Sequence, residues 1–352
     1  MFSLFFFPHH WNLCEDRHTA RLILGSCPVR KPVPFGLGVH ARAGHVLPSF
    51  LPIIKQVQQN LEQMPLFDHR SYSGKKKTSP HCKIRSPASS MDGAVRSVWA
   101  DNFKAESRLL HQIAPAVVHV ALNVQYPGCV FVHGNGRNHR DLTAEERYEL
   151  IRANVALLMP LQVGIAVRTD DGRRFAWEFN LRGFDITSRK HARDPKSVAY
   201  LAGCGVDFSR LPRAGIDGYR LRWLLRDSGL IRARPSWATF AGAYHVAYFV
   251  TMMYGEKLPH SLNAFMEMAR QLIGRPLYDV KRLAREHDRS CVGALSNVVG
   301  KLAAVPPGEG ISKSKPAGTG SIMALLAFET LKNKLGADME KYRHELCGLQ
   351  VV

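Results

Sequence analysis

The stretch VHVALNVQYPGCVF, residues 118–131, contains the strand around which the rest of the chain is organised. Its apolar, β-branched start predicts a buried strand over residues 117–124, and a Pro-Gly pair separates this strand from a shorter one around residues 129–132. Two amides, Asn123 and Gln125, lie two residues apart at the end of the first strand, so their side chains point to one face of the sheet. A pair of metal-binding acids would suit this place, and amides in a core strand are unusual.

The pattern on either side of this strand predicts an α/β domain. Residues 94–114 have the apolar spacing of a helix, and residues 142–158 form a second helix with a capping box between Thr143 and Glu146. Residues 161–181 form two strands joined by a turn at Asp171-Gly172. Helical patterns follow at 195–203, 216–228, 243–254, 261–272, 278–287, 292–303 and 320–335, with an extended piece at 236–240. Strands followed by helices around one more strand predict an α/β sandwich with a mixed central sheet.

The composition is that of a globular protein in a reducing compartment. The chain has 352 residues, of which 45% are hydrophobic, so it can bury a sizeable core. Its seven cysteines form no CxxC pair and are odd in number, which disfavours a disulfide framework or a structural zinc site. The apolar start ends at Pro8, too early for a signal sequence, and no later run reaches the length of a membrane span. We therefore expect a soluble intracellular protein with no membrane partner.

The net charge of +19 suggests a polyanionic partner such as RNA, although a merely soluble basic protein would fit equally well. Residues 1–90 carry 12 Lys/Arg against 4 Asp/Glu, so the excess is spread over the whole chain. Scattered Pro and Gly in this segment predict a disordered basic extension with no chemistry of its own. The triplet at 75–77 is more typical of a solvated loop than of a localisation signal.

Eight motifs occur in the order and at the intervals typical of one family. They are VWADN, VALNVQYPGCV, YELIRANVALLMPLQVGIAV, WEFNLRGFDI, GVDF, WATFAGAYHVAYFVTMM, LYDVKRL and KPAGTGSIMALLAF. This set, over residues 95–335, resembles the Caf/Pop deadenylase family, the ribonuclease-H-like exonuclease subunit of the Ccr–Not complex that shortens mRNA poly(A) tails. The resemblance implies a ribonuclease-H-like three-layer fold, with a mixed central sheet flanked by helices, for a domain at residues 91–340. Residues 1–90 are then an extension and residues 341–352 a tail.

Members of that family cleave RNA with two divalent metal ions, Mg or Mn, held by four carboxylates. Two dications roughly 4 Å apart need hard, anionic oxygen ligands, and neutral amides are poor replacements because magnesium sheds its water reluctantly. The resemblance therefore makes the residues at the four acid positions decisive.

None of the four positions carries an acid in this sequence. The resemblance places Asn123 and Gln125 at the first two positions, His245 at the third and Gly320 at the fourth. A family histidine, a candidate general base, is replaced by Lys315. We therefore predict that the two-metal site does not form, that no catalytic residue is intact and that the chain uses no cofactor.

Several residues remain as alternative ligands or binding groups. His245 alone could recruit zinc, although a hydrogen-bonded histidine near the core is the more common case. Lys315 could pair with a phosphate or be solvated. The possible substitute acids are Glu178, Asp185 and Asp279, of which Asp279 lies in the YDVK motif and is expected to serve the fold. The aromatic residues Trp237, Phe240, Tyr244 and Tyr248 are expected in the core rather than on a base-stacking platform.

The resemblance implies a Ccr–Not-associated deadenylase homologue in mRNA poly(A) tail shortening and turnover, predicted to be catalytically inactive, with a scaffold or RNA-binding role. Its expected partners are the Ccr–Not scaffold, the deadenylase subunits and poly(A) RNA, in the nucleus and the cytoplasm. Two alternatives remain open. One is an active poly(A)-specific 3′-exoribonuclease that releases AMP with divalent metal, and the other is a decaying gene product with no selected function.

Overall fold

The computed structural model describes residues 95–132, 137–274, 276–304 and 316–352. Its strands are β1 (Val95–Val98), β2 (Val117–Gln125), β3 (Gln162–Thr169), β4 (Arg174–Asn180), β5 (Ser236–Thr239) and β6 (Leu277–Asp279). They form one mixed sheet in the order β1-β4-β3-β2-β5-β6. The β1–β4, β2–β5 and β5–β6 pairs are parallel, whereas β2–β3 and β3–β4 are antiparallel. The predicted extension at residues 1–90 lies outside the described residues.

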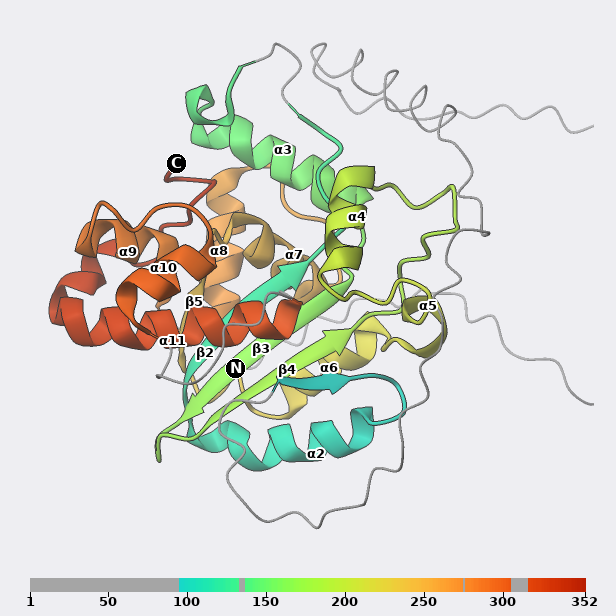
Figure 1. The fold of residues 1–352 in the computed structure, drawn as a ribbon, viewed down its shortest axis with the longest axis horizontal. Helices are drawn as coiled ribbons and strands as arrows, with labels where there is room; N and C mark the ends of the chain where they lie inside the picture. Colours follow the sequence, from blue (N-terminus) through green and yellow to red (C-terminus); the bar gives the residue numbers. More distant parts are fainter. Residues whose placement is uncertain (1–94, 133–136, 275, 305–315) are drawn as a thin grey trace, which may run out of the picture. The chain divides into compact units, whose positions relative to one another are not determined.

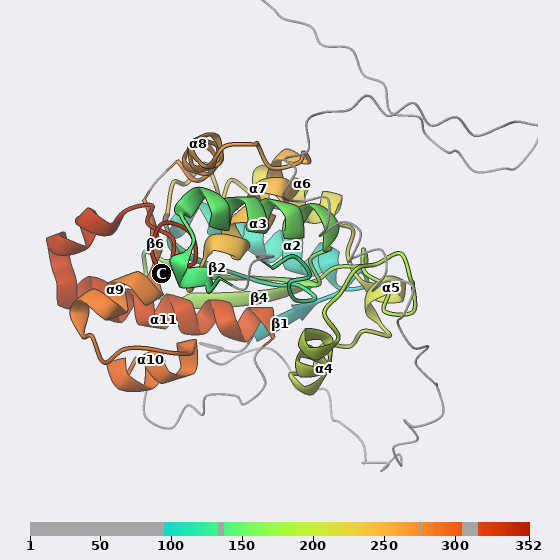
Figure 2. The ribbon, with the colours of Figure 1, turned by 90° about the horizontal axis from the view of Figure 1, so that it is seen from above.

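Helices cover both faces of the sheet and complete a three-layer α/β fold, as predicted. They are α2 (Phe103–Ile113), α3 (Ala144–Leu157), α4 (Pro195–Gly203), α5 (Leu211–Ala214), α6 (Gly218–Asp227), α7 (Ala243–Tyr254), α8 (Leu262–Ile273), α9 (Val280–His287), α10 (Leu295–Leu302) and α11 (Ala317–Leu335). Short 3₁₀ helices lie at Ala114–Ala116, His139–Asp141 and Gly336–Tyr342. Figures 1 and 2 show α9, α10 and α11 on one face, and α3, α7 and α8 on the other.

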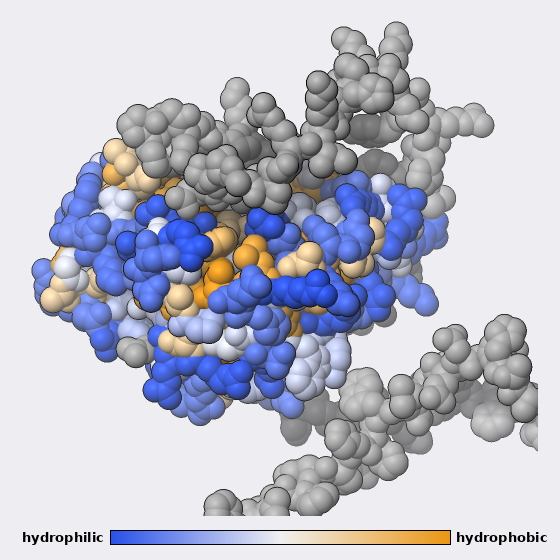
Figure 3. Space-filling view, turned by 90° about the horizontal axis from the view of Figure 1, so that it is seen from below, coloured by the Kyte–Doolittle hydropathy of each residue, from blue (hydrophilic) through white to orange (hydrophobic). Residues whose placement is uncertain are grey.

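The two faces of the sheet differ in the size of their side chains. Large residues of β2, β3 and β4, among them Leu122, Ile165 and Trp177, form the main core with α2, α3, α6, α7 and α8. The opposite face presents small residues, Ala121, Ala166, Ala176 and Ala238, to α9, α10 and α11. Side chains alternate between faces along a strand, so the sequence pattern alone creates this asymmetry. Hydrophilic residues cover most of the surface seen in Figure 3, with hydrophobic residues gathered near its middle.

The small-residue face lets α11 lie directly on the strands. At Gly164 of β3, an added Cβ would lie 1.9 Å from the carbonyl oxygen of Ala317, the first residue of α11. No residue with a side chain fits there, because the obstructing atom belongs to the backbone. The N-terminal turn of α11 is thereby fixed over the middle of the sheet, beside the end of β2.

Several predicted elements differ from the structure. The helix predicted over residues 94–114 is a strand, β1, followed by a shorter helix, because Val95–Val98 pairs with β4. Residues 129–132 form no strand. The backbone N–H groups of Val130 and Phe131 instead donate to Oδ1 of Asn154 at 2.8 and 3.0 Å. The helix predicted from residue 278 begins at Val280, after the short strand β6. The capping box at Thr143 is confirmed.

The C-terminal residues 341–352, predicted to be a tail, contribute to the core. Leu346 and Leu349 are completely buried in the main core. The backbone N–H of Cys347 donates to Asp279, and the carbonyl oxygen of Leu349 accepts from Nε of Arg147 at 2.7 Å. No helix among the described residues is long and apolar enough to cross a membrane.

The close approach of α11 predicts the effect of adding one methyl group. We expect Gly164→Ala to destabilise the protein by about 3 kcal/mol, because overpacking against backbone forces the helix away from the sheet. Gly203→Ala, at the end of α4 where an added Cβ meets no atom within 4 Å, is the control. Urea denaturation measures both. A Gly164→Ala variant as stable as Gly203→Ala would contradict the contact.

Candidate functional site

The two amides at the end of β2 lie on the face that α11 covers. In the β2–β3 pairing, Asn123 is opposite Gly164 and Gln125 is opposite Gln162. Both amide side chains are half-buried. Because β2 is continuous, Asn123 and Gln125 lie on one face, as predicted. Both side chains point toward the N-terminal end of α11.

Asn123 bonds to α11 in place of a carboxylate at this position. Its Nδ2 donates to the carbonyl oxygen of Ala317 at 3.2 Å. An added Cβ at Gly320 would lie 2.3 Å from Nδ2 and 2.9 Å from Cγ of Asn123. The structure thus brings together two of the four predicted positions, and the amide of Asn123 occupies the space that a side chain at residue 320 would need.

His245 lies in the first turn of α7 and is tied to the sheet through Thr239. The hydroxyl of Thr239 donates to the carbonyl oxygen of Leu122 at 3.1 Å, and Nδ1 of His245 lies 3.2 Å from the same hydroxyl oxygen. Because the hydroxyl proton is already used, Nδ1–H of a neutral imidazole is the donor in the second bond. Burial lowers the pKa of His245 to about 4, which keeps the ring uncharged at neutral pH.

Lys315, which stands where the family has a histidine, lies outside the described residues.

Glu178 of β4 is a buried carboxylate at the N-terminus of α11. Its Oε2 accepts from the backbone N–H of Gly318 at 3.1 Å, while Oε1 of Gln162 accepts from that of Ala317 at 3.3 Å. A carboxylate here also faces the positive end of the helix dipole. Burial nevertheless raises the pKa of Glu178, and the bond from Gly318 opposes this shift. No sequence pattern placed Glu178 near Asn123, although an acid within the apolar run of β4 was a usable signal.

The other two candidate acids accept hydrogen bonds that hold the fold together. Both oxygens of Asp279, which is completely buried, accept backbone N–H bonds, and the four donors are Ala241, Gly242, Lys281 and Cys347. Asp279 therefore caps α9 and joins three segments of the fold, as its motif suggested. Asp185 lies in a loop, where Oδ1 accepts from the N–H and the hydroxyl of Thr187.

These residues do not fit a pair of divalent metal ions. Within residues 95–132, 137–274, 276–304 and 316–352, no three His, Cys, Asp or Glu side chains are grouped closely enough to hold a metal ion. Asn123 directs an N–H donor toward α11, and Gly320 has no side chain. Glu178, the nearby acid, already caps that helix. Magnesium requires several hard oxygen ligands in near-octahedral geometry, which this donor set does not supply.

Comparison with known proteins relates the chain to one family. The model of the CAF1 family ribonuclease matches residues 98–222, a segment that contains Asn123 and Gln125. Over 269 residues, the chain is 29% identical to "Probable CCR4-associated factor 1 homolog 7" of Arabidopsis thaliana, covering 73% of this chain and 94% of the relative. The chain is therefore similar to the CAF1 ribonuclease family over these residues. A second Arabidopsis thaliana relative, "Probable CCR4-associated factor 1 homolog 10", is 29% identical over 273 residues, which cover 73% of this chain and 92% of that protein.

Solved structures of the CAF1 family share the fold. The RNase domain of the yeast Pop2 protein superposes with a TM-score of 0.59 at 22% identity, covering 73% of this chain and 94% of that domain. The Mg2+- and Mn2+-bound form of S. pombe Pop2p gives the same TM-score, 0.59, and identity, 22%, over 72% of this chain and 99% of that protein. Yeast CAF1 co-crystallised with the NOT1 MIF4G domain gives 0.56 at 22% identity, over 75% of this chain and the whole of the matched chain.

The contact between Asn123 and Gly320 predicts a reversal of the usual Gly→Ala effect. In a helix, replacing Gly by Ala normally stabilises by about 1 kcal/mol. We expect that gain for Gly300→Ala in α10, where an added Cβ meets no atom within 4 Å. For Gly320→Ala we expect no gain or a net loss, because the methyl displaces the amide of Asn123 from its bond to α11.

A double-mutant cycle isolates this contact. In an Asn123→Ala background, Gly320→Ala should recover the full gain, which gives a coupling energy of about 1–2 kcal/mol between the two positions. Thermal or urea unfolding of the four variants measures it. If Gly320→Ala alone stabilises as much as Gly300→Ala, the two residues are not in contact.

The half-buried imidazole of His245 predicts a pH dependence of stability. Its folded pKa of about 4 lies below the ordinary value of 6.5. The unfolded chain therefore binds a proton that the folded chain does not, and stability falls as the pH drops through this window. Between pH 7 and pH 5, the wild type should lose about 2 kcal/mol more than His245→Asn, which keeps a polar partner for Thr239. Urea denaturation at both pH values checks this, and exposed His260→Asn should follow the wild type.

Proposed function

We propose that this chain is a non-catalytic member of the CAF1 ribonuclease family that acts in mRNA poly(A) tail shortening and turnover as a scaffold or RNA-binding subunit associated with the Ccr–Not complex. The observation that carries the proposal is the contact of Asn123 with Ala317 and Gly320, which fills the place of the acid pair with a neutral amide. The nucleus and the cytoplasm are the proposed compartments.

The loss of catalysis follows from charge as much as from shape. Two-metal hydrolysis of a phosphodiester uses one ion to generate the nucleophile and the other to stabilise the leaving oxygen. Four carboxylates would offset the charge of both ions. Asn123, Gln125, neutral His245 and Gly320 together offset none of it. The same neutral surface no longer repels a phosphate backbone, and the net charge of +19 favours RNA association.

A scaffold role is supported by the family members that have been solved. The yeast relative co-crystallised with the NOT1 MIF4G domain aligns with this chain over its full length. We propose a corresponding NOT1-type scaffold as the partner of this chain, together with the deadenylase subunits of the complex.

One observation favours an alternative, an active poly(A)-specific 3′-exoribonuclease that releases AMP with divalent metal. Glu178 lies at the N-terminus of α11, on the sheet face that also carries Asn123, and is a substitute acid in a suitable place. Its oxygen is already used by Gly318, which is why we rank this activity second.

An oligo(A) assay separates the two functions. We expect the purified full-length chain to leave labelled oligo(A) intact with Mg²⁺ or Mn²⁺. A variant with Asn123→Asp, Gln125→Glu, His245→Asp and Gly320→Asp should cut at least about 1,000-fold faster, since each 1.36 kcal/mol of transition-state stabilisation is worth tenfold.

Two controls make the assay decisive. Mg²⁺ should raise the melting temperature of the fourfold variant, because the restored acids repel one another without it, and should leave that of the native chain unchanged. Binding of both proteins to a NOT1 MIF4G fragment should be equal. Metal-dependent AMP release by the native chain, abolished by Glu178→Gln, would overturn the proposal in favour of the alternative.

A further inference from the structure

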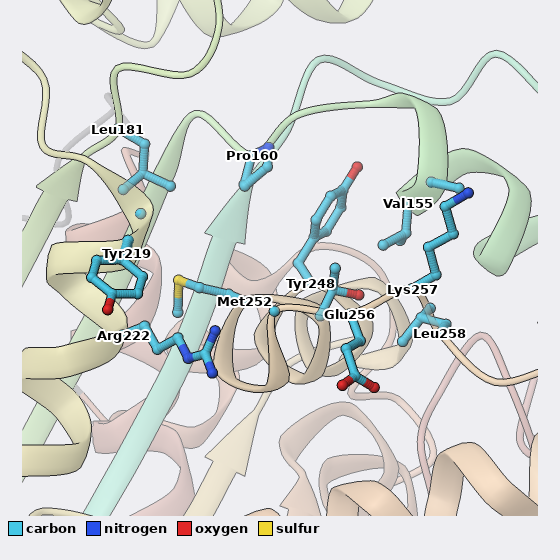
Figure 4. A pocket seen from close by; sticks show the side chains of 14 residues that line it. Val155, Pro160, Leu181, Tyr219, Arg222, Tyr248, Met252, Glu256, Lys257 and Leu258 are labelled. Carbon is cyan, nitrogen blue, oxygen red and sulfur yellow. The ribbon is translucent and has the colours of Figure 1, made fainter. Parts of the chain in front are cut away.

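A cavity of about 560 Å³ lies between α3, α6 and α7, where Tyr248 of its wall packs against Tyr126, the residue that follows β2. Figure 4 shows its side chains, with Tyr248 near the centre of the labelled group. The lining residues of α7, from Tyr248 to Gly255, begin almost one turn after His245 and continue to the end of that helix. The cavity is thus on the face of the sheet opposite α11, and its volume is in the range that holds small organic ligands.

Most of the cavity wall is apolar. Val155 of α3, Met252 of α7 and Leu258 of the following loop line it, together with Pro160 and Leu181 at the ends of neighbouring strands. These side chains offer dispersion contacts and no hydrogen bonds. The body of any ligand that fits this wall is therefore apolar.

Two hydroxyl groups in the wall have no hydrogen-bond partner among the residues that the structure describes. Oη of Tyr248 and Oγ1 of Thr251 are buried without a hydrogen bond, and Tyr248 is only 3% exposed. A buried polar group left unpaired costs about 1–3 kcal/mol, so its presence requires an explanation. Figure 4 shows the Tyr248 hydroxyl at the end of the ring away from α7, on the side of Pro160 and Val155. A threonine in a helix has two χ1 rotamers available, so the Thr251 hydroxyl can turn toward a ligand.

Arg222 supplies a positive charge at the rim. It is half-buried and makes no hydrogen bond or ion pair with any residue that the structure describes. Its Nη1 lies 2.2 Å from where a Cβ at Gly255 would be, so only glycine lets the guanidinium reach this position. Gly255 also has a φ of +75°, and the negative end of the α7 dipole helps to hold the cation. Lys257 and Glu256 add opposite charges, which leaves the rim positive by one.

We propose that this cavity binds a small organic anion, with an apolar body between α3 and α7 and a carboxylate or phosphate on Arg222. The hydroxyls of Tyr248 and Thr251 bond to a polar atom of the body. Inorganic phosphate alone does not fill the apolar wall, and a neutral hydrocarbon leaves all three polar groups without partners. The inference is independent of catalysis, because the cavity wall includes none of the residues at the four acid positions.

A fluorescent aromatic sulfonate, 1-anilinonaphthalene-8-sulfonate, is the first probe, because it combines an apolar body with one anionic group. We expect saturable binding of one molecule per full-length chain. Displacement by indole-3-acetate, decanoate and AMP then distinguishes an aromatic acid, an acyl chain and a nucleotide as the natural class.

Matched variants test the charge. Arg222→Gln should weaken probe binding about tenfold, the effect of losing one charge-assisted hydrogen bond. Arg220→Gln removes the same charge from the same helix at a residue that does not line the cavity, and should change affinity less than about twofold. Equal affinity in the two variants, or no saturable binding at all, would overturn the proposal.

A second pair tests the hydroxyls. Tyr248→Phe with Thr251→Val removes two groups that have no partner, so stability without probe should stay equal or rise, while probe affinity should fall about tenfold. Thr330→Val, which removes a hydroxyl bonded within α11, is the control and should not change affinity. Undiminished binding by the double variant would show that the hydroxyls do not bond to the probe and would refute their role.

Discussion

The contact between the first turn of α11 and the small-residue face of the sheet determines the rest of this structure. Ala121, Ala166 and Ala176 remove bulk from that face, and Gly164 leaves space for the carbonyl group of Ala317. The helix can therefore rest on the backbone of β3, with its first N–H groups bonded to Gln162 and Glu178. Interiors packed this closely are barely compressible, so the helix has little freedom to shift on the sheet.

That helix position gives the amide of Asn123 its significance. Loss of an acid could have left an open pocket that recruits other ligands. Here Asn123 bonds to the helix, and Gly320 has no side chain that would occupy the same space. The substitutions at residues 123 and 320 are thus complementary: one adds an internal hydrogen bond and the other removes the side chain that would obstruct it. A neutral His245, bonded to Thr239, completes a site held together by hydrogen bonds between protein groups.

The sequence predicted those elements whose signals, such as strand alternation or a helix cap, lie within the element itself. The alternation in β2 placed Asn123 and Gln125 on one face, and the capping box at Thr143 set the start of α3. Strands β1 and β6 were missed because four and three residues carry little periodicity and are defined by distant pairing partners. The strand at residues 129–132 was wrong because Asn154 binds that backbone instead. Glu178 was a candidate acid, but its place beside α11 was not predicted because its partner, Gly318, is 140 residues away.

The buried carboxylate of Asp279 ties the C-terminal residues to the rest of the fold by a hydrogen bond. The backbone of Cys347 is one of its four donors, and the others come from the start of α7 and from α9. A chain cut after residue 340 would lose that donor together with the buried side chains of Leu346 and Leu349. Expression vectors that trim the last dozen residues, or proteases that clip them in cells, would consequently weaken the strand and helix that orient His245 rather than remove a dispensable appendage.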